Sequence, residues 1–178
     1  FSPEKVSSSR LFEAYRVLRT NLSLADRSPT RTPLIVVTSS REAEGKTTTT
    51  SGLAASLALN GQRVLLIDCD LRRGSLSRLL KAKGRPGLTD ALSGRALARC
   101  IVPTPVKGLD LLPSGSSHPN PAEILGRVGL VDIVESLRAD YDWIFCDAPP
   151  ALAVADAAIV CRVADSAIVV VGANLTPS

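Results

Sequence analysis

A glycine followed by a lysine and two threonines lies where the chain is expected to pass from a strand into a helix. The tetrapeptide Gly45-Lys46-Thr47-Thr48 separates an apolar run at residues 34–37 from a segment with helical spacing. At such a turn, backbone N–H groups and a helix N-terminus converge and bind phosphate oxygens, while a lysine and a hydroxyl complete the cradle. The segment therefore predicts a P-loop that binds a nucleoside triphosphate through Glu44, Gly45, Lys46, Thr47 and Thr48.

The loop departs from the usual P-loop pattern at several positions. Ser40 stands where the pattern has glycine, and Ala43 would cost roughly 1 kcal/mol if its backbone had to take a positive φ. Glu42 and Glu44 must point away from the phosphates, because their charge would oppose binding. For the loop alone, the alternative is a Gly-Lys-Thr sequence at an ordinary helix start.

Three aspartates follow apolar runs further along the chain. Residues 63–67 lead into Asp68 and Asp70, and residues 143–146 lead into Asp147. Both runs are typical of buried parallel strands, and the ligands of a doubly wound sheet lie outside the carboxyl ends of its strands. We therefore expect these carboxylates beside the phosphate cradle, although an aspartate that ends a strand can also form a turn or cap a helix.

The aspartates suggest a division of labour around a phosphoryl group. Asp68 and Asp70 are two residues apart, so in an extended chain they share a face and could flank one Mg²⁺. We expect Asp68 to accept a proton from an attacking hydroxyl, and Thr47, Asp70 and Asp147 to hold hydrated Mg²⁺ on the β- and γ-phosphates. The predicted catalytic residues are Lys46, Asp68 and Asp70.

Strand and helix patterns alternate along the part of the chain that would position these residues. Strand patterns occupy residues 34–37, 63–67, 109–112, 143–146 and 167–171, and helical patterns occupy residues 47–60, 75–80, 88–93, 122–139 and 154–162. Alternation of this kind predicts a three-layer α/β fold.

A further helix is expected ahead of these elements. Leu11, Tyr15, Leu18 and Leu22 recur at helical spacing, residues 1–9 are polar and loose, and residues 28–33 form a linker. We therefore divide the chain into residues 1–32, which carry the helix and linker, and residues 33–178, which form the nucleotide-binding domain.

Composition restricts the alternatives. The 178 residues are 45% hydrophobic and 3% aromatic, enough for one domain with an aliphatic core. No apolar stretch approaches the roughly 20 residues of a membrane span, and no signal peptide is visible, which predicts a soluble portion.

The net charge of +4 could attract an anionic partner, but few aromatic rings are available for stacking bases, so we expect no nucleic acid. The four cysteines lack zinc-site spacing and are expected to be reduced.

Four segments together resemble the bacterial protein-tyrosine kinases of capsule and exopolysaccharide synthesis. These are residues 13–22, 44–48, 66–73 and 141–150, in the family's order and spacing, and residues 112–115 and 120–123 are also similar. In that family the second to fourth segments are called Walker A, Walker A′ and Walker B. The resemblance implies a mostly parallel sheet with MinD/ParA-like P-loop topology, ATP and Mg²⁺ as cofactors, and phosphate transfer to tyrosine in trans.

The same resemblance implies partners. In the family a Glu-x-x-Arg-x-x-Arg motif, here Glu13, Arg16 and Arg19, contacts the neighbouring subunit of a ring, whereas its spacing also allows an intrahelical ion pair. The family portion lies in the cytoplasm at the inner face of the membrane and works with a membrane polysaccharide co-polymerase segment or an activator protein. We expect a last helix, a last strand and a tyrosine cluster of the family to be missing after Ser178.

Two other functions are compatible with the sequence. A MinD/ParA-like switch ATPase would share the fold, the P-loop and the aspartates, and its extra lysine would fall at the position of Arg41. A degenerate, non-catalytic scaffold is suggested by Glu42 and Ala43, which replace the Pro-Gly of the kinase family.

Overall fold

The computed structural model describes residues 10–25, 31–126 and 129–173. The predicted loose segment at residues 1–9 and residues 28–30 of the predicted linker lie outside these ranges. Among the helices in the described ranges, none is both long enough and apolar enough to cross a membrane.

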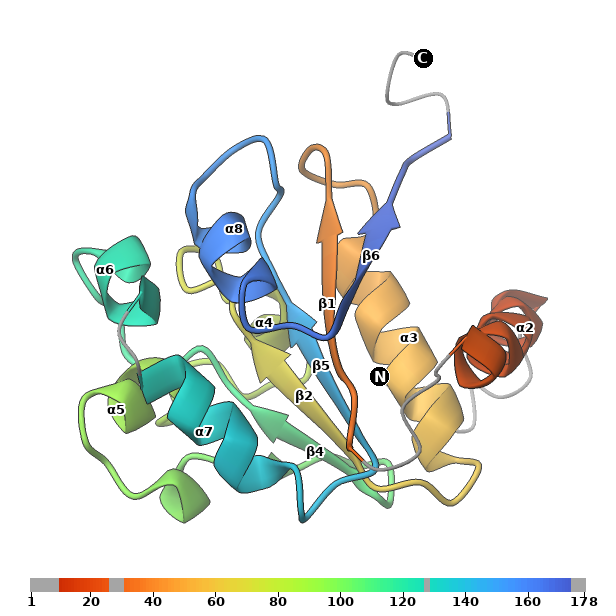
Figure 1. Cartoon of the computed structure of the whole chain (residues 1–178), viewed down its shortest axis with the longest axis horizontal. Helices are drawn as coiled ribbons and strands as arrows, with labels where there is room; N and C mark the ends of the chain where they lie inside the picture. The colour runs from red at the N-terminus through yellow and green to blue at the C-terminus, as the bar shows by residue number, and fades with distance from the viewer. Residues whose placement is uncertain (1–9, 26–30, 127–128, 174–178) are drawn as a thin grey trace.

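A six-stranded sheet forms the centre of the molecule (Figure 1). Its strands are β1 Leu34–Ser39, β2 Val64–Asp68, β3 Val102–Pro103, β4 Leu109–Leu112, β5 Trp143–Asp147 and β6 Ser166–Val170. They lie in the order β3-β4-β2-β5-β1-β6, and every neighbouring pair is parallel except β3 with β4. The predicted α/β fold with a mostly parallel sheet is confirmed. The two-residue strand β3 is too short to give a sequence pattern, and it was not predicted.

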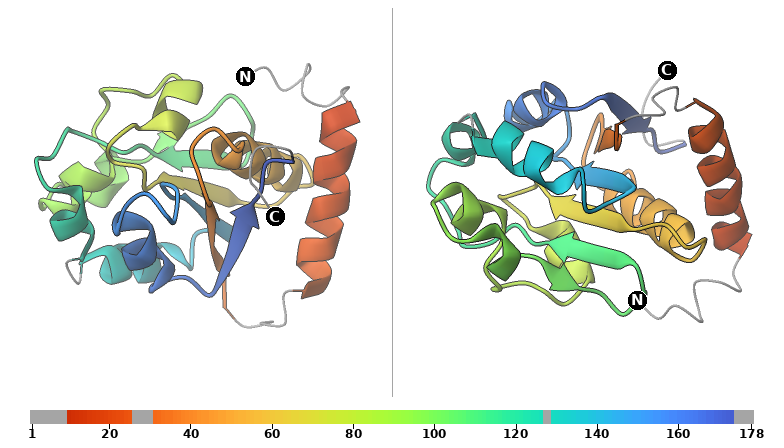
Figure 2. Two further views of the ribbon diagram at one scale, coloured as in Figure 1. Left: turned by 90° about the horizontal axis from the view of Figure 1, so that it is seen from above. Right: turned by 60° about the horizontal axis from the view of Figure 1, so that its bottom comes forward.

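Helices cover both faces of this sheet (Figures 1 and 2). They are α2 Arg10–Ala25, α3 Lys46–Ala58, α4 Ser75–Leu79, α5 Leu88–Leu92, α6 Pro121–Gly126, α7 Gly129–Leu137 and α8 Asp156–Cys161, with a 3₁₀ turn at Leu97–Arg99. The single helix predicted at residues 122–139 is wrong, because two helices, α6 and α7, occupy this range.

Alternating strand residues enter two separate cores. Ile35, Val37 and Leu66 face α3 and α2, whereas Val36, Ile67 and Cys146 face α5, α7 and α8. Because side chains alternate across a pleated strand, a run that is apolar throughout supplies both cores at once. This explains why the central strands are apolar at nearly every position.

Helix α2 packs along the outer side of α3 (Figure 2). The Tyr15 ring lies so close to Gly52 that a Cβ there would be 2.3 Å from its Cε2 atom, so the contact requires glycine. Arg19 Nη1 donates a hydrogen bond of 3.0 Å to the Ser56 carbonyl on α3. The expected apolar stripe needs one correction: Leu11 is 56% exposed, because Phe12 occupies the inward position at this end of the helix.

Candidate nucleotide-binding site

The loop between β1 and α3 has the backbone shape of a phosphate cradle. Gly45 immediately precedes α3 with a φ of 94°, and no heavy atom lies within 4 Å of the place where its Cβ would be. The side of the loop next to Gly45 is therefore open. Ala43 has a φ of 63°, so it takes the left-handed conformation that the usual pattern assigns to glycine.

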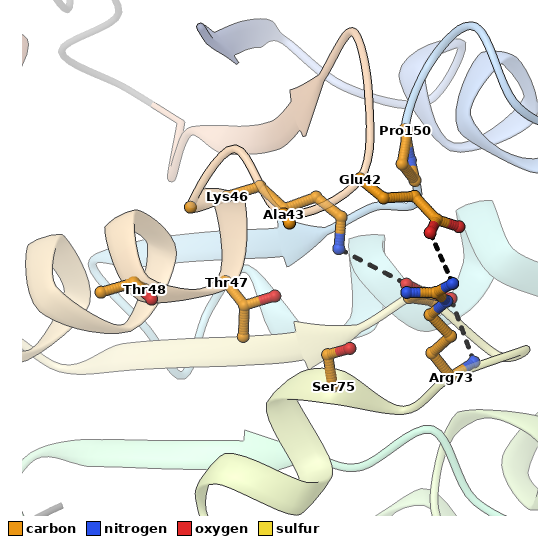
Figure 3. Close-up of a pocket in the computed structure, with 10 residues that line it drawn as sticks. Glu42, Ala43, Lys46, Thr47, Thr48, Arg73, Ser75 and Pro150 are labelled. Atoms are coloured by element: carbon orange, nitrogen blue, oxygen red, sulfur yellow. Dashed lines mark hydrogen bonds and ion pairs between the residues drawn. The ribbon is translucent and has the colours of Figure 1, made fainter. Parts of the chain in front are cut away.

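A cavity of about 330 Å³ lies in front of this loop (Figure 3). Its walls come from the loop, from the start of α3 and from residues that follow β2 and β5: Glu42, Ala43, Gly45, Lys46, Thr47, Thr48, Asp70, Arg73, Ser75 and Pro150. The carboxyl ends of three neighbouring strands thus meet the start of α3, as predicted for a doubly wound sheet.

Lys46 is a buried cation with two acidic neighbours. Its ammonium lies 3.4 Å from Asp70 Oδ2 and 4.0 Å from Asp147 Oδ1, and the residue is only 8% exposed. Burial of a charge is expensive unless opposite charges compensate it, and the two carboxylates provide this compensation. The side chain reaches the cavity, where a phosphate could replace a carboxylate as its partner.

Thr47 connects the cradle to the buried end of β5. Its hydroxyl donates a hydrogen bond of 2.7 Å to Asp147 Oδ2, and Thr50 donates a longer one of 3.4 Å to Oδ1. Burial raises the pKa of Asp147 to about 6, although Lys46 and Thr47 oppose this shift. Because the Thr47 hydrogen is directed at Asp147, the lone pairs of its oxygen are available to a cation.

The oxygen atoms of Thr47, Asp70 and Asp147 fit the needs of Mg²⁺, which prefers oxygen ligands and keeps several waters. Within the described ranges, no three His, Cys, Asp or Glu side chains are gathered closely enough to hold a metal alone. The residues therefore fit a hydrated ion shared with phosphate oxygens better than an all-protein cage.

Asp68 and Asp70 face different surroundings. Asp68 is fully buried and its Oδ2 accepts hydrogen bonds from the Ser77 backbone N–H at 2.7 Å and hydroxyl at 2.6 Å. Burial raises the pKa of Asp68 to about 7, although the bonds from Ser77 oppose the shift. Asp70 lines the cavity and Asp68 does not. The two carboxylates have different surroundings because β2 ends at Asp68 and the chain turns immediately after it. That both flank one Mg²⁺ stays a prediction.

The two loop glutamates behave differently. Glu44 accepts hydrogen bonds from the Arg41 N–H at 2.7 Å and the Ser40 hydroxyl at 2.9 Å, so its side chain turns away from the cavity. Only its backbone is left to contact a nucleotide. Glu42 lines the cavity and forms an ion pair of 2.6 Å with Arg73 (Figure 3). Sequence reasoning missed Arg73, although its place three residues after Asp70 could have indicated it.

The motif residues of α2 lie away from this cavity. Glu13 and Arg16 form an exposed intrahelical ion pair of 2.9 Å. Arg19 instead contacts the Ser56 carbonyl of its own chain. Only the first two therefore form the intrahelical pair that the spacing allows.

Comparison with known proteins identifies the family. A family model described as an AAA domain matches residues 32–176. Tyrosine-protein kinase YwqD of Bacillus subtilis is 37% identical over 167 residues, which cover 92% of this chain and 69% of that protein. The chain belongs to the bacterial tyrosine-protein kinase family. A larger member of this kinase family, tyrosine-protein kinase wzc of Salmonella typhimurium, is 38% identical over 89% of this chain, which spans only 22% of that protein.

Solved structures agree with this membership in the tyrosine-kinase family. The kinase domain of Escherichia coli tyrosine kinase ETK matches with a TM-score of 0.86 and 34% identity, over 92% of this chain and 64% of that chain. The septum site-determining protein MinD from Pyrococcus horikoshii, complexed with Mg-ADP, matches with a TM-score of 0.67 and 30% identity, over 78% and 57%. The fold is thus shared with MinD-type P-loop ATPases. Of these two structures, the ETK kinase domain has the higher TM-score.

Proposed function

We propose that this chain is the catalytic part of an ATP- and Mg²⁺-dependent protein-tyrosine kinase that phosphorylates tyrosines of another copy. The observation that carries the proposal is the arrangement of Lys46, Thr47 and Asp70 around one cavity, with Asp147 directly behind Thr47. A role in synthesis or export of an extracellular polysaccharide is supported by two relatives, a putative tyrosine-protein kinase EpsB and a putative tyrosine-protein kinase in a cps region.

Each residue has a specific task in this proposal. The backbone N–H groups of Gly45, Lys46, Thr47 and Thr48 bind phosphate oxygens, and the Lys46 ammonium exchanges a carboxylate for a phosphate. When bound, Mg²⁺ would neutralise charge on the β- and γ-phosphates, held by Thr47, Asp70 and Asp147 directly or through water. Electrostatic stabilisation and positioning of this kind account for most of the catalysis of phosphoryl transfer.

Asp68 is the proposed proton acceptor. The acceptor oxygen forms a bond to the γ-phosphorus while the bond from that phosphorus to the β–γ bridging oxygen breaks. The electron pair leaves with ADP, and the hydroxyl proton passes to Asp68. Because Asp68 is fully buried, the cavity wall must rearrange when nucleotide and acceptor bind. Catalytic hydrogen bonds commonly tighten only in the complex with substrate.

The wider setting is also part of the proposal. Residues 1–32 would form a helix-and-linker unit that joins copies into a ring, and residues 33–178 would form the kinase domain. The chain would work in the cytoplasm at the inner face of the membrane, with a membrane polysaccharide co-polymerase segment or an activator protein as partner. The exposed Glu13–Arg16 pair on the outside of α2 supports an accessible contact surface there.

A phosphorylation assay tests the activity. Wild-type protein, Lys46→Ala and Asp68→Asn are incubated with Mg·ATP and a tyrosine-rich peptide, and nucleotide binding is measured by calorimetry. We expect Lys46→Ala to lose binding, whereas Asp68→Asn should bind normally but transfer phosphate about 10²–10⁴-fold more slowly, since an amide cannot accept the proton. Lys107→Ala, on an exposed loop, is the control for loss of a lysine.

The same assay separates the alternatives. ATP hydrolysis without transfer to any tyrosine would favour a switch ATPase, in which Arg41 replaces the extra lysine. Nucleotide binding without either reaction would favour a non-catalytic scaffold. Unchanged affinity in a folded Lys46→Ala variant would overturn the P-loop assignment itself.

A further inference from the structure

Ser77 links Asp68, at the end of β2, to the loop that follows the neighbouring strand β4. The Ser77 hydroxyl accepts a hydrogen bond of 2.9 Å from the Ser114 backbone N–H and donates one of 2.6 Å to Asp68 Oδ2. A serine hydroxyl has a single hydrogen, and the short distance to a carboxylate assigns that hydrogen to Asp68. The two hydrogen bonds therefore run in one direction: the Ser114 N–H donates to Ser77, and the Ser77 hydroxyl donates to Asp68.

The loop that carries Ser114 is held in place by hydrogen bonds from α5. The Leu88 N–H bonds to the Pro113 carbonyl at 2.7 Å, and the Thr89 N–H bonds to the Ser114 carbonyl at 3.1 Å. A Cβ at Gly87 would lie only 2.1 Å from the Pro113 oxygen, so the two backbones approach as closely as glycine allows. The Ser114 N–H is consequently a fixed anchor for the Ser77 hydroxyl.

As a result, the two carboxylate oxygens of Asp68 differ in their hydrogen bonding. Oδ2 accepts both the hydroxyl and the backbone N–H of Ser77. Oδ1 is buried without a hydrogen-bond partner among the described residues. An unsatisfied buried carboxylate oxygen is costly, and such exceptions in native proteins call for an explanation beyond packing. A helix-capping role would account for Oδ2 alone and would leave Oδ1 unexplained.

We infer that Ser77 is a positioning residue for phosphoryl transfer, which holds Oδ2 of Asp68 and so reserves Oδ1 for the proton of the acceptor hydroxyl. This inference rests on the proposed function, in which Asp68 takes that proton. Ser77 itself touches neither nucleotide nor acceptor, since the cavity is lined by its neighbour Ser75 and not by Ser77. Without the Ser77 hydroxyl, the carboxylate keeps one donor and can rotate, so the acceptor meets the correct oxygen less often.

Steady-state kinetics of Ser77→Ala tests the inference, with tyrosine-peptide phosphorylation and ATP hydrolysis both measured. We expect the kcat of whichever reaction the wild-type protein catalyses to fall about 10- to 100-fold, the loss expected for one hydrogen bond to a charged group. The KM for the acceptor and the nucleotide affinity should be unchanged. Ser77→Thr keeps the hydroxyl and should restore most of the rate. Ser56→Ala, which removes another fully buried serine hydroxyl on α3, should not lower kcat.

A second measurement separates positioning from general stability. In an Asp68→Asn background, Ser77→Ala should cause no further loss of rate, because it acts only through the carboxylate. Equal losses in both backgrounds, or a wild-type kcat in folded Ser77→Ala, would overturn the inference. A wild-type protein that hydrolyses ATP but labels no tyrosine would overturn the kinase proposal alone, because the Ser77→Ala effect would then be read from hydrolysis. Absence of both reactions in the wild-type protein would overturn both.

Discussion

Thr47 and Asp147 join the first turn of α3 to the end of β5 through one hydrogen bond of 2.7 Å, although 100 residues separate them in the chain. Asp147 is fully buried, so this hydroxyl is part of what makes its burial tolerable. The same bond directs the Thr47 hydrogen away from the cavity and leaves its lone pairs facing a potential cation. One contact thus serves both the stability of the site and its fit to Mg²⁺.

Thr47→Val therefore has two expected effects. The shape of the side chain is nearly preserved, but Asp147 loses its nearest donor, which should lower the free energy of unfolding by about 1–3 kcal/mol. The Mg²⁺ concentration needed for nucleotide binding should rise by about tenfold or more. Chemical denaturation and calorimetry at several Mg²⁺ concentrations measure these effects, with the exposed Thr20→Val on α2 as control. An unchanged Mg²⁺ requirement would remove Thr47 from the metal site.

Ala43→Gly is expected to stabilise the protein. Ala43 has a φ of 63°, a conformation that costs a residue with a Cβ about 1 kcal/mol and costs glycine little. Part of this gain is offset by the greater freedom of glycine in the unfolded chain, which costs about 0.4–1 kcal/mol, so we expect a net rise of up to about 0.5 kcal/mol in the free energy of unfolding. Lys81 has a φ of 57°, so Lys81→Gly is a second test of the same effect. Destabilisation at both positions would contradict the explanation by backbone strain.

Acid should weaken the anchor between β1 and the segment before β6. Burial alone would raise the pKa of Asp165, but hydrogen bonds from Arg138 at 2.7 Å and from the Leu34 N–H at 2.7 Å bring it below its ordinary value of 3.8. A carboxyl whose pKa is lowered by folding contributes stability above its unfolded pKa and loses it as the pH falls through the folded value. Asp165→Asn should therefore flatten the loss of stability below pH 3.8.

Denaturation curves between neutral and strongly acidic pH measure this effect. Asp132→Asn, which removes an exposed carboxylate of α7, is the matched control for loss of an aspartate. If the free energy of unfolding falls equally steeply at acid pH in wild-type protein and in Asp165→Asn, other carboxyl groups determine the loss of stability in acid.

Five strands of this fold could be predicted because they are apolar runs, and four of them, β1, β2, β4 and β5, supply both cores at once. The placement of Lys46, Thr47 and Asp70 beside one cavity also followed from the strand-to-helix pattern, because parallel strands bring their carboxyl ends together. The separation of Asp68 from Asp70 could not be predicted, since it depends on the residue at which β2 ends. Contacts such as Glu42 with Arg73 and Ser77 with Asp68 depend on tertiary packing, which spacing along the chain does not encode.

Assembly through α2 is expected to depend on Arg16 more than on Arg19. Arg16 is exposed, and within the described part of the chain its ion pair is with Glu13 of its own helix, whereas Arg19 holds α2 on α3 through the Ser56 carbonyl. Arg16→Glu should therefore convert any ring into monomers without loosening the helix. Sedimentation at equal protein concentration, with nucleotide present, measures this, and Thr20→Val is the control. An unchanged oligomer, or a wild-type protein that is monomeric at every concentration, would contradict a role of the motif in assembly. The Glu13–Arg16 pair would then be only an ion pair within α2.

Both tyrosines of the chain are unsuited as phosphate acceptors. The Tyr15 hydroxyl donates to the Thr48 carbonyl at 3.2 Å, and the Tyr141 hydroxyl donates to Asp110 Oδ2 at 3.0 Å. They are 8% and 9% exposed, and burial raises the pKa of both hydroxyls. A hydroxyl that is buried and already bonded cannot approach a γ-phosphate in line while the domain is folded.

The folded chain should therefore label itself poorly with Mg·ATP but phosphorylate an added tyrosine-rich peptide. Mass spectrometry of the chain and of the peptide after incubation measures this, and a peptide with phenylalanine in place of every tyrosine is the control. Stoichiometric phosphate on Tyr15 or Tyr141 in folded protein would contradict the expectation, because it would require the hydroxyl to leave its buried hydrogen bond. Phosphate on the tyrosine peptide alone would mean that the natural acceptors lie outside these 178 residues.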